Sequence, residues 1–207
     1  MAEPLFPLLS LARLRMGMDG DGVTTLVAGK GCPLSCRWCI NKRLLREAPA
    51  ENVDAAELIS RLSVDDLYFR ATGGGATFGG GESLLHAAFI ARFRELCPPE
   101  WRVFAETSLA VPREKVLTAL GAVDGFIVDC KDMDRDIYRR YTGRDGSLTE
   151  ENLRLLLREA GPERVIVRVP LIPEYNTPED QARSAEKLRA MGFTRLDLFE
   201  YVIRENQ

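Results

Sequence analysis

Short apolar runs alternate with amphipathic segments along most of the chain, and this alternation restricts its possible folds more than any other feature. The apolar runs predict strands at 23–28, 67–72, 102–106, 126–129, 165–169 and 196–203. Helices are predicted between them at 54–62, 83–96, 112–121, 149–160 and 178–191. Such alternation builds a parallel sheet with right-handed crossovers, and the number of units falls short of a closed barrel. We therefore predict an α/β fold, a partial (β/α)6 TIM-like barrel, as a single domain over residues 1–207.

Composition and charge narrow the class of function. The 207 residues are 45% hydrophobic and 29% charged, with a net charge of −3. An acidic balance argues against a broad nucleic-acid surface, and no apolar stretch approaches the roughly 20 residues of a membrane span. Residues 1–10 lack the charged lead and the cleavage site of a signal peptide. We expect a cytoplasmic monomer that binds neither nucleic acid nor membrane.

Three of the five cysteines, Cys32, Cys36 and Cys39, crowd into one short segment after the first predicted strand. An odd number of cysteines spaced in this way suits a ligand set better than a disulfide framework. Three thiolates on one loop can hold three irons of a [4Fe–4S] cluster and leave the fourth iron open. A zinc site, which would need a fourth ligand, and inert packing are the alternatives. Cys97 and Cys130 match no cluster spacing and are expected to pack.

Polar and glycine-rich segments fall at the ends of other predicted strands. Residues 74–82 follow the second predicted strand and end in Gly80-Gly81-Glu82, where glycines let the backbone approach a ligand closely. Asp129 and Lys131 alternate at the end of the fourth strand, so both can face the same side. Arg168 adds a cation from the fifth strand, and a solvated ion pair is the alternative interpretation. Ligands of open α/β sheets bind at such carboxyl ends, which favours an enzyme.

These motifs resemble those of a known family. The C-x3-C-x2-C spacing with Trp38 before the third cysteine is similar to the radical S-adenosylmethionine (SAM) signature. Residues 74–82 resemble the G-G-V-T-x-S-G-G-E segment of the pyruvate formate-lyase activating enzyme family, with Gly79 in place of the usual serine. Further matches follow in order at 19–23, Asn41, 106–108, 129–134, 141–143, 168–173 and Asn176.

The resemblance implies a partial barrel of the radical SAM type, with a [4Fe–4S] cluster on the three cysteines and SAM chelated to the open iron. It implies that SAM is cleaved reductively to a 5′-deoxyadenosyl radical, which abstracts hydrogen from a backbone glycine of a large glycyl-radical enzyme. Gly80, Gly81 and Glu82 would hold the SAM amino group, and Glu106 would belong to a monovalent-cation site. The expected cofactor-binding residues are Trp38, Asn41, Gly80, Gly81, Glu82, Glu106, Asp129, Lys131 and Arg168.

Some residues have more modest expectations. Trp38 either packs near the cluster or the adenine, or only anchors its loop. His86, the single histidine, is expected to have a surface or packing role. Residues 40–79 contain no cysteine, so the additional clusters of some activating enzymes are not expected. The histidine-bearing segment that follows the sixth strand in this family is also not expected here.

The segment around the three cysteines is locally basic. Its five cations have no acid between them: Lys30, Arg37, Lys42, Arg43 and Arg46. We interpret them as a docking patch for an acidic electron donor, flavodoxin or ferredoxin, with an ordinary solvated loop as the alternative.

The predicted function is therefore that of an anaerobic radical SAM oxidoreductase that activates a glycyl-radical enzyme. A radical SAM enzyme that acts on a small molecule or peptide is the second hypothesis. A cluster- or zinc-holding interaction protein without catalysis is the third.

Overall fold

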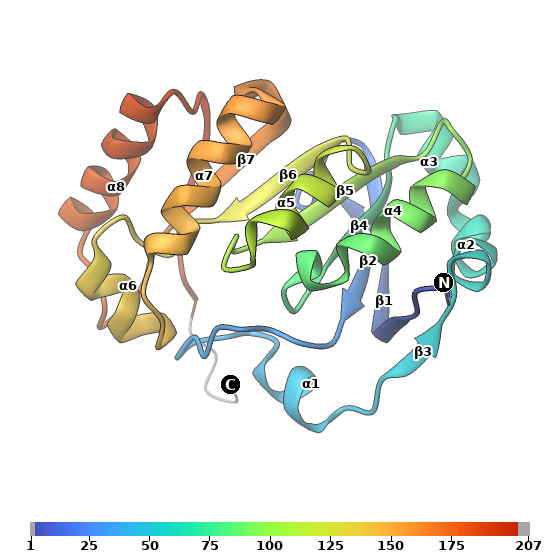
Figure 1. Ribbon diagram of the computed structural model, residues 1–207, viewed down its shortest axis with the longest axis horizontal. Coiled ribbons are helices and arrows are strands. Elements are labelled where there is room, and N and C mark those ends of the chain that lie inside the picture. Colours follow the sequence, from blue (N-terminus) through green and yellow to red (C-terminus); the bar gives the residue numbers. More distant parts are fainter. Residues whose placement is uncertain (1–2, 203–207) are drawn as a thin grey trace.

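The computed structural model describes residues 3–202 and is organised around one open mixed sheet (Figure 1). The strand order is β3-β1-β2-β4-β5-β6-β7-β8; β2 and β4 to β8 run parallel to one another, and β1 is antiparallel to both β2 and β3. The bounds are β1 Phe6–Met16, β2 Val23–Gly29, β3 Glu51–Val53, β4 Gly75–Gly80, β5 Arg102–Thr107, β6 Gly125–Asp129, β7 Val165–Leu171 and β8 Arg195–Glu200. The prediction of an open, partial barrel is confirmed, and the two antiparallel strands at its start were not predicted.

Helices cover one face of this sheet, with α4, α5 and α7 lying side by side across it (Figure 1). The α-helices are α1 Lys42–Glu47, α2 Ala55–Leu62, α3 Asp66–Thr72, α4 Ala87–Leu96, α5 Arg113–Leu120, α6 Arg135–Thr142, α7 Ser147–Ala160 and α8 Pro178–Met191. Short 3-10 turns occur at Ser63–Asp65, Ser83–His86 and Pro162–Arg164. No helix within residues 3–202 is long and apolar enough to cross a membrane.

The start of α2 and of α8 follows directly from side chains in the sequence. Asp54 is the N-cap of α2 and accepts a hydrogen bond from the backbone N–H of Glu57. Thr177 and Asp180 form a reciprocal capping box at α8, with Pro178 in the first turn. These helices confirm the predictions at 54–62 and 178–191.

The predicted strand at 67–72 is wrong, because these residues form helix α3. Leu67 is 74% exposed while Phe69 is fully buried, so the run has one apolar helical face and is not buried on both sides. Gly73 then ends the helix in the left-handed conformation, with φ of 69°. The second parallel strand is instead the glycine-rich segment itself, β4, which had been predicted to follow a strand.

The two faces of the parallel strands differ in chemistry. Towards the helices the strands present fully buried apolar side chains such as Phe78, Ala105 and Val167. Successive side chains of a strand point to opposite faces, so Glu106 and Arg168 lie on the other, concave face. The predicted final strand at 196–203 corresponds to β8, and its last residue, Ile203, lies outside the described residues. The fold thus places charged side chains on the concave face near the carboxyl ends of its strands.

Candidate active site

The loop that carries the three cysteines leaves β2 and runs along the carboxyl ends of the strands towards α6, before it returns to α1 (Figure 1). Two backbone hydrogen bonds fix it there, from Ser35 N to Thr142 O at 2.9 Å and from Arg37 N to Tyr141 O at 3.1 Å. Both acceptors belong to the last turn of α6, so the cysteine loop is bonded to this helix on each side of Cys36. This helix was not among the predicted elements, although Asp134 caps it in the manner expected of an N-cap.

The donor set of this loop fits the predicted cluster. Cys32, Cys36 and Cys39 are free thiols, Cys32 exposed and the other two partly buried. Burial raises the pKa of Cys32 to about 11. Burial also raises the pKa of Cys36, and the positive charge of the nearby Lys131 offsets part of that rise. The Cys32 and Cys36 thiols of the metal-free chain are thus protonated at neutral pH, and metal binding must displace those protons. Within residues 3–202, no group of three or more Cys, His, Asp or Glu side chains lies close enough together to hold one metal ion.

The remaining cysteines and the histidine pack as predicted. Cys97 and Cys130 belong to the hydrophobic core. The His86 Nε2 atom lies 2.9 Å from the carbonyl oxygen of Lys30, and its ring packs edge-on against Phe6 with centroids 5.1 Å apart.

Two residues of the cysteine segment connect it to neighbouring loops. The Trp38 Nε1–H donates to the carbonyl oxygen of Pro173 at 3.4 Å, and the Arg37 guanidinium lies 5.4 Å from the Trp38 ring centroid. The Asn41 Nδ2 donates to the carbonyl oxygen of Gly80 at 2.8 Å. Asn41 therefore joins the cysteine segment to the end of β4, and Trp38 joins it to the loop after β7.

The Gly80-Gly81-Glu82 segment packs directly against the backbone that precedes Cys32. Gly81 N donates to Gly29 O at 3.1 Å, and Glu82 N donates to Gly31 O at 2.8 Å. A Cβ atom on Gly79 would lie 2.5 Å from Glu106 Oε2, so the absence of a side chain leaves room for that carboxylate. This contact gives a physical reason for the glycine at the position where the resembling family has serine.

The Glu82 carboxylate is buried and accepts four hydrogen bonds from protein donors. The Thr107 and Ser108 hydroxyls both donate to it at 2.6 Å, Ser108 N donates at 2.8 Å and Leu84 N at 3.1 Å. Burial raises the pKa of Glu82, and the donors from Ser108 and Thr107 oppose that rise. In this structure the carboxylate joins the ends of β4 and β5. Sequence reasoning noted the segment at 106–108 but did not identify Thr107 and Ser108 as hydrogen-bond partners of Glu82.

Charged side chains from β5 to β8 form a cluster on the concave face. Arg168 pairs with Glu106 at 2.8 Å and lies 3.8 Å from both Asp19 and Asp197. Asp129, Arg168 and Asp197 are register partners on three adjacent strands, which explains why residues far apart in sequence meet here. Burial raises the pKa of Glu106, although Arg168 opposes the rise.

Lys131 lies buried beside this cluster. Its Nζ donates to Asp129 Oδ2 at 3.1 Å and lies 6.0 Å from the Tyr201 ring centroid. Burial is the largest single influence and would lower the pKa of Lys131, but the attraction of Asp129 together with smaller contributions from other neighbours raises it above its ordinary value. An ammonium group has three N–H donors, so this cation can bind a further anionic group.

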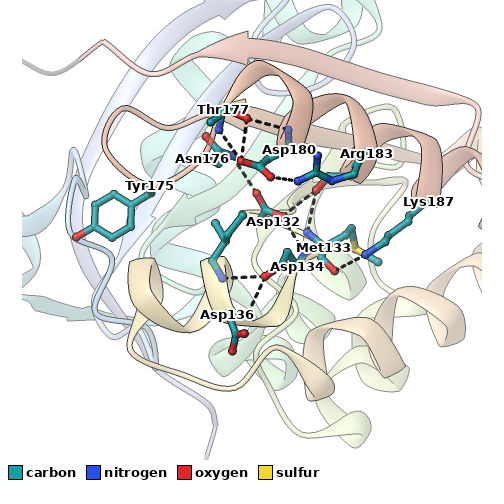
Figure 2. Close-up of polar contacts among 12 residues, drawn as sticks. Asp132, Met133, Asp134, Asp136, Tyr175, Asn176, Thr177, Asp180, Arg183 and Lys187 are labelled. Carbon is teal, nitrogen blue, oxygen red and sulfur yellow. Dashed lines mark hydrogen bonds and ion pairs between the residues drawn. The ribbon is translucent and has the colours of Figure 1, made fainter.

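A buried network holds the turn that carries Lys131 (Figure 2). The Asp132 carboxylate accepts from the Ser184 hydroxyl at 2.9 Å and from Asn176 Nδ2 at 3.0 Å. Asn176 also accepts from Ile172 N at 2.5 Å, and Met133 N donates to Ser184 Oγ at 3.0 Å. The network links the turn after β6 to α8 and to the β7–α8 loop, which Trp38 contacts. Sequence reasoning matched Asp132 and Asn176 to family motifs but assigned them no role.

Known proteins resemble this chain in sequence and in fold. The family model of the radical SAM superfamily matches residues 26–196. Pyruvate formate-lyase 2-activating enzyme of Escherichia coli is 32% identical over 199 residues, covering 81% of this chain and 67% of that protein. The (2S)-3-sulfopropanediol dehydratase activating enzyme of Klebsiella oxytoca is 28% identical over 220 residues, covering 76% and 69%.

A solved structure agrees at the level of the fold. The structure of Streptococcus suis SuiB bound to the precursor peptide SuiA superimposes with a TM-score of 0.67 at 10% identity, covering 86% of this chain but 38% of that one. The family and its relatives imply a [4Fe–4S] cluster and SAM as cofactors, in agreement with the three thiols of the loop. The chain therefore belongs to the radical SAM superfamily, and within it the chain is similar to activating enzymes.

Proposed function

We propose that the protein is the activating enzyme of a glycyl-radical enzyme, and that it abstracts a hydrogen atom from a backbone glycine of that partner. One observation carries the proposal: a chain similar to activating enzymes over most of its length holds three free thiols beside the Gly80–Glu82 turn and Lys131. When bound, the reduced cluster and SAM together supply a 5′-deoxyadenosyl radical for this abstraction.

The side chains of the site have separate tasks in this proposal. Cys32, Cys36 and Cys39 would hold the cluster, and Lys131 would bind the SAM carboxylate with the donors that Asp129 leaves available. Glu82 keeps the ends of β4 and β5 together beneath the glycine turn, whose backbone would contact the SAM amino group. Arg168 balances the acidic side chains on the concave face, so that the site does not accumulate uncompensated negative charge near an anionic ligand.

The open sheet is compatible with a protein substrate. Strands β3 and β8 are the two edges of the sheet and do not pair with each other. A substrate that is part of a large folded protein must present its glycine on a segment of backbone, and an incomplete barrel leaves one side unclosed for such a segment. This geometry is compatible with a polypeptide substrate.

The electron is proposed to come from flavodoxin or ferredoxin. The exposed Cys32 lies on the same loop as the exposed Arg37, and Arg43 and Arg46 are exposed on α1. The basic patch is smaller than the sequence suggests, because Lys30 donates to Ala48 O at 2.8 Å and Arg43 pairs with Glu47 at 2.9 Å. The remaining positive charge would favour an acidic donor protein.

A cytoplasmic location is part of this proposal. The chain holds its five cysteines as free thiols, which suits a reducing compartment. A strongly reducing electron donor and an oxygen-sensitive cluster require the same surroundings.

The test is anaerobic reconstitution with iron and sulfide, followed by SAM, a reductant and candidate glycyl-radical enzymes encoded near this chain. The proposal expects 5′-deoxyadenosine together with a glycyl-radical signal in electron paramagnetic resonance of one partner. Formation of 5′-deoxyadenosine with a small molecule or peptide, and no radical in any partner, would favour the second hypothesis. A protein that binds iron but never cleaves SAM would contradict both.

A further inference from the structure

The phenol of Tyr141 is buried without a hydrogen-bond partner. In the described part of the chain, only two buried side-chain oxygens lack a partner: Tyr141 Oη and Thr24 Oγ1. The side chain of Tyr141 is among the largest that are fully enclosed, with 1% of the residue exposed. Tyr138, three residues earlier on the same helix, is equally buried but bonds the Thr149 hydroxyl at 2.9 Å.

A buried hydroxyl without a partner is unfavourable. It loses its hydrogen bonds to water and gains none from the protein, so such groups are rare in native structures and point to a ligand or a bound water. Burial raises the pKa of Tyr141, so the group remains protonated and can donate. Tyr201 lies close, with ring centroids 6.4 Å apart, but the two phenol oxygens do not meet hydrogen-bond geometry in this structure.

Tyr141 lies beside the cysteine loop. Its carbonyl oxygen accepts from Arg37 N, and the next carbonyl, of Thr142, accepts from Ser35 N, so the pair brackets Cys36. The ring packs edge-on against Tyr175, with centroids 5.1 Å apart, and Figure 2 shows Tyr175 at the start of the segment that leads into α8. The phenol is thus held in place by a second aromatic ring and by the backbone of its own helix.

The same phenol is close to Lys131. Lys131 Nζ lies 6.0 Å from the Tyr201 ring centroid, and the Tyr201 ring lies 6.4 Å from the Tyr141 ring, so Tyr201 neighbours both side chains. Lys131 also has donor capacity beyond its bond to Asp129. Lys131 and Tyr141 are thus two donors, one cationic and one neutral, that neighbour the same ring, and the backbone of Tyr141 lies beside the segment that carries Cys36.

We propose that the Tyr141 hydroxyl donates a hydrogen bond to an anionic group that binds between Cys36 and Lys131, and that Tyr141 is a cofactor-binding residue of this enzyme. Two sources supply the same anionic chemistry: the carboxylate of SAM beside Lys131, or a sulfur of the cluster beside Cys36. The proposal rests on the cofactors of the superfamily and is independent of the identity of the protein partner.

The test compares Tyr141→Phe with Tyr138→Phe in the anaerobically reconstituted protein. Each change removes one buried hydroxyl from α6, but only Tyr138 loses a protein partner. Two quantities are measured for each: the Kd for SAM, and the midpoint potential of the cluster without SAM. Neither measurement needs the glycyl-radical partner, so failure of the proposed function would leave this test intact.

Tyr141→Phe is expected to leave the melting temperature of the metal-free protein unchanged, whereas Tyr138→Phe is expected to lower it. If the acceptor is the SAM carboxylate, Tyr141→Phe weakens SAM binding roughly tenfold, since bonds to charged groups are the stronger ones. If the acceptor is a cluster sulfur, the midpoint potential falls and the Kd for SAM is unchanged. Tyr138→Phe changes neither quantity. A Tyr141→Phe protein with normal SAM affinity and a normal potential would overturn the proposal and assign the hydroxyl to a bound water.

Discussion

Two glutamates at the carboxyl ends of the strands, Glu82 and Glu106, differ in how many hydrogen-bond donors surround their carboxylates. Glu82 is 2% exposed and surrounded by donors, so its charge is satisfied by the protein before any ligand arrives. Glu106 has one donor in Arg168 and acidic neighbours in Asp19 and Asp129. The first residue therefore acts as a structural anchor, and the second is poised to change its protonation state.

Replacement of Glu82 by glutamine tests the anchor. The amide presents two N–H groups to donors that already point at this position, so at least one buried group loses its acceptor. The free energy of unfolding should fall by about 1–3 kcal/mol. Urea unfolding of the metal-free protein measures this free energy, and Glu151→Gln on the exposed face of α7 is the matched control. An unchanged midpoint for Glu82→Gln would show that this carboxylate does not hold β4 and β5 together.

Glu106 predicts a pH dependence of stability. Its pKa is raised from an ordinary 4.5 to about 7 in the folded state, chiefly by burial. A raised pKa means that the folded protein binds the proton more tightly than the unfolded chain does, so this contribution is complete below pH 4.5 and is lost as the pH rises towards 7. The free energy of unfolding of the metal-free protein should thus decline across this window. The decline should be smaller in Glu106→Gln. An identical pH profile of unfolding free energy in the unmodified protein and in Glu106→Gln would refute this role of Glu106.

At the scale of elements, the site depends on loops that are tied to one another. The turn after β6, the loop after β7 and the first half of α8 meet at Asp132 (Figure 2). The cysteine loop joins them through the hydrogen bond from Trp38 to the carbonyl oxygen of Pro173. A network of this kind is worth more when complete than when partly broken. It gives the turn that carries Lys131 a fixed position relative to the cysteine loop.

Asn176→Ala tests this coupling. The change leaves Ile172 N without its acceptor and removes one donor from Asp132, so stability should fall by about 1–3 kcal/mol. The SAM affinity of the reconstituted protein should also weaken, because the turn with Lys131 loses its anchor. The control is Thr177→Ala, which removes the N-cap of α8 and should cost about 1 kcal/mol without altering SAM affinity. Equal SAM affinities in Asn176→Ala and Thr177→Ala would remove the network from the site.

Sequence reasoning was most reliable where local signals and burial agree. Asp54 and Thr177 carry capping signals, and the helices that they begin were predicted closely. Strand β4 was missed because its glycines give no strand signal; they are needed where neighbouring backbones leave no room for a side chain. The apolar letters of α3 resembled a strand instead, since a short run has no clear period.

In the site too, features set by local sequence were predicted, and features set by distant segments were not. The cysteines were found from their spacing alone, because ligands on one loop must be close in sequence. Most side-chain partners of Glu82 and Asp132, among them Thr107, Ser108 and Asn176, come from segments more than 20 residues away, and only the folded sheet brings them together. The segment 141–143 matched the family, but nothing in the sequence singled out the Tyr141 hydroxyl, because a tyrosine without a partner has the same sequence pattern as one with a partner.

At the scale of the whole molecule, the proposed function requires access for two proteins, an electron donor and a substrate. The cysteine loop and α1 present the cations nearest to the proposed cluster, while the helices α4, α5 and α7 cover the other face of the sheet (Figure 1). Complementary charge mainly raises the rate of association and makes it sensitive to salt. The basic patch should therefore affect the rate of electron delivery more than the chemistry that follows.

Charge reversal of Lys42 and Arg43 to glutamate tests the patch. Reduction of the cluster by flavodoxin at low salt should slow by about three- to tenfold, and added salt should narrow the difference. Reduction by dithionite should change little. The control reverses Arg154 and Arg158, which are exposed on α7. A normal rate with flavodoxin at low ionic strength in the Lys42/Arg43 variant would make the patch ordinary surface.

The central claim is that Cys32, Cys36 and Cys39 hold a cluster that cleaves SAM. The most direct measurement is the yield of 5′-deoxyadenosine per chain after anaerobic reconstitution and reduction, with the iron content determined on the same samples. The unmodified protein should contain about four irons and produce 5′-deoxyadenosine, and Cys97→Ala, which changes only a core residue, should do the same. Alanine at Cys32, Cys36 or Cys39 should abolish the product. Product formation that survives the loss of any of these three cysteines, or a folded and reconstituted protein without 5′-deoxyadenosine, would contradict the claim.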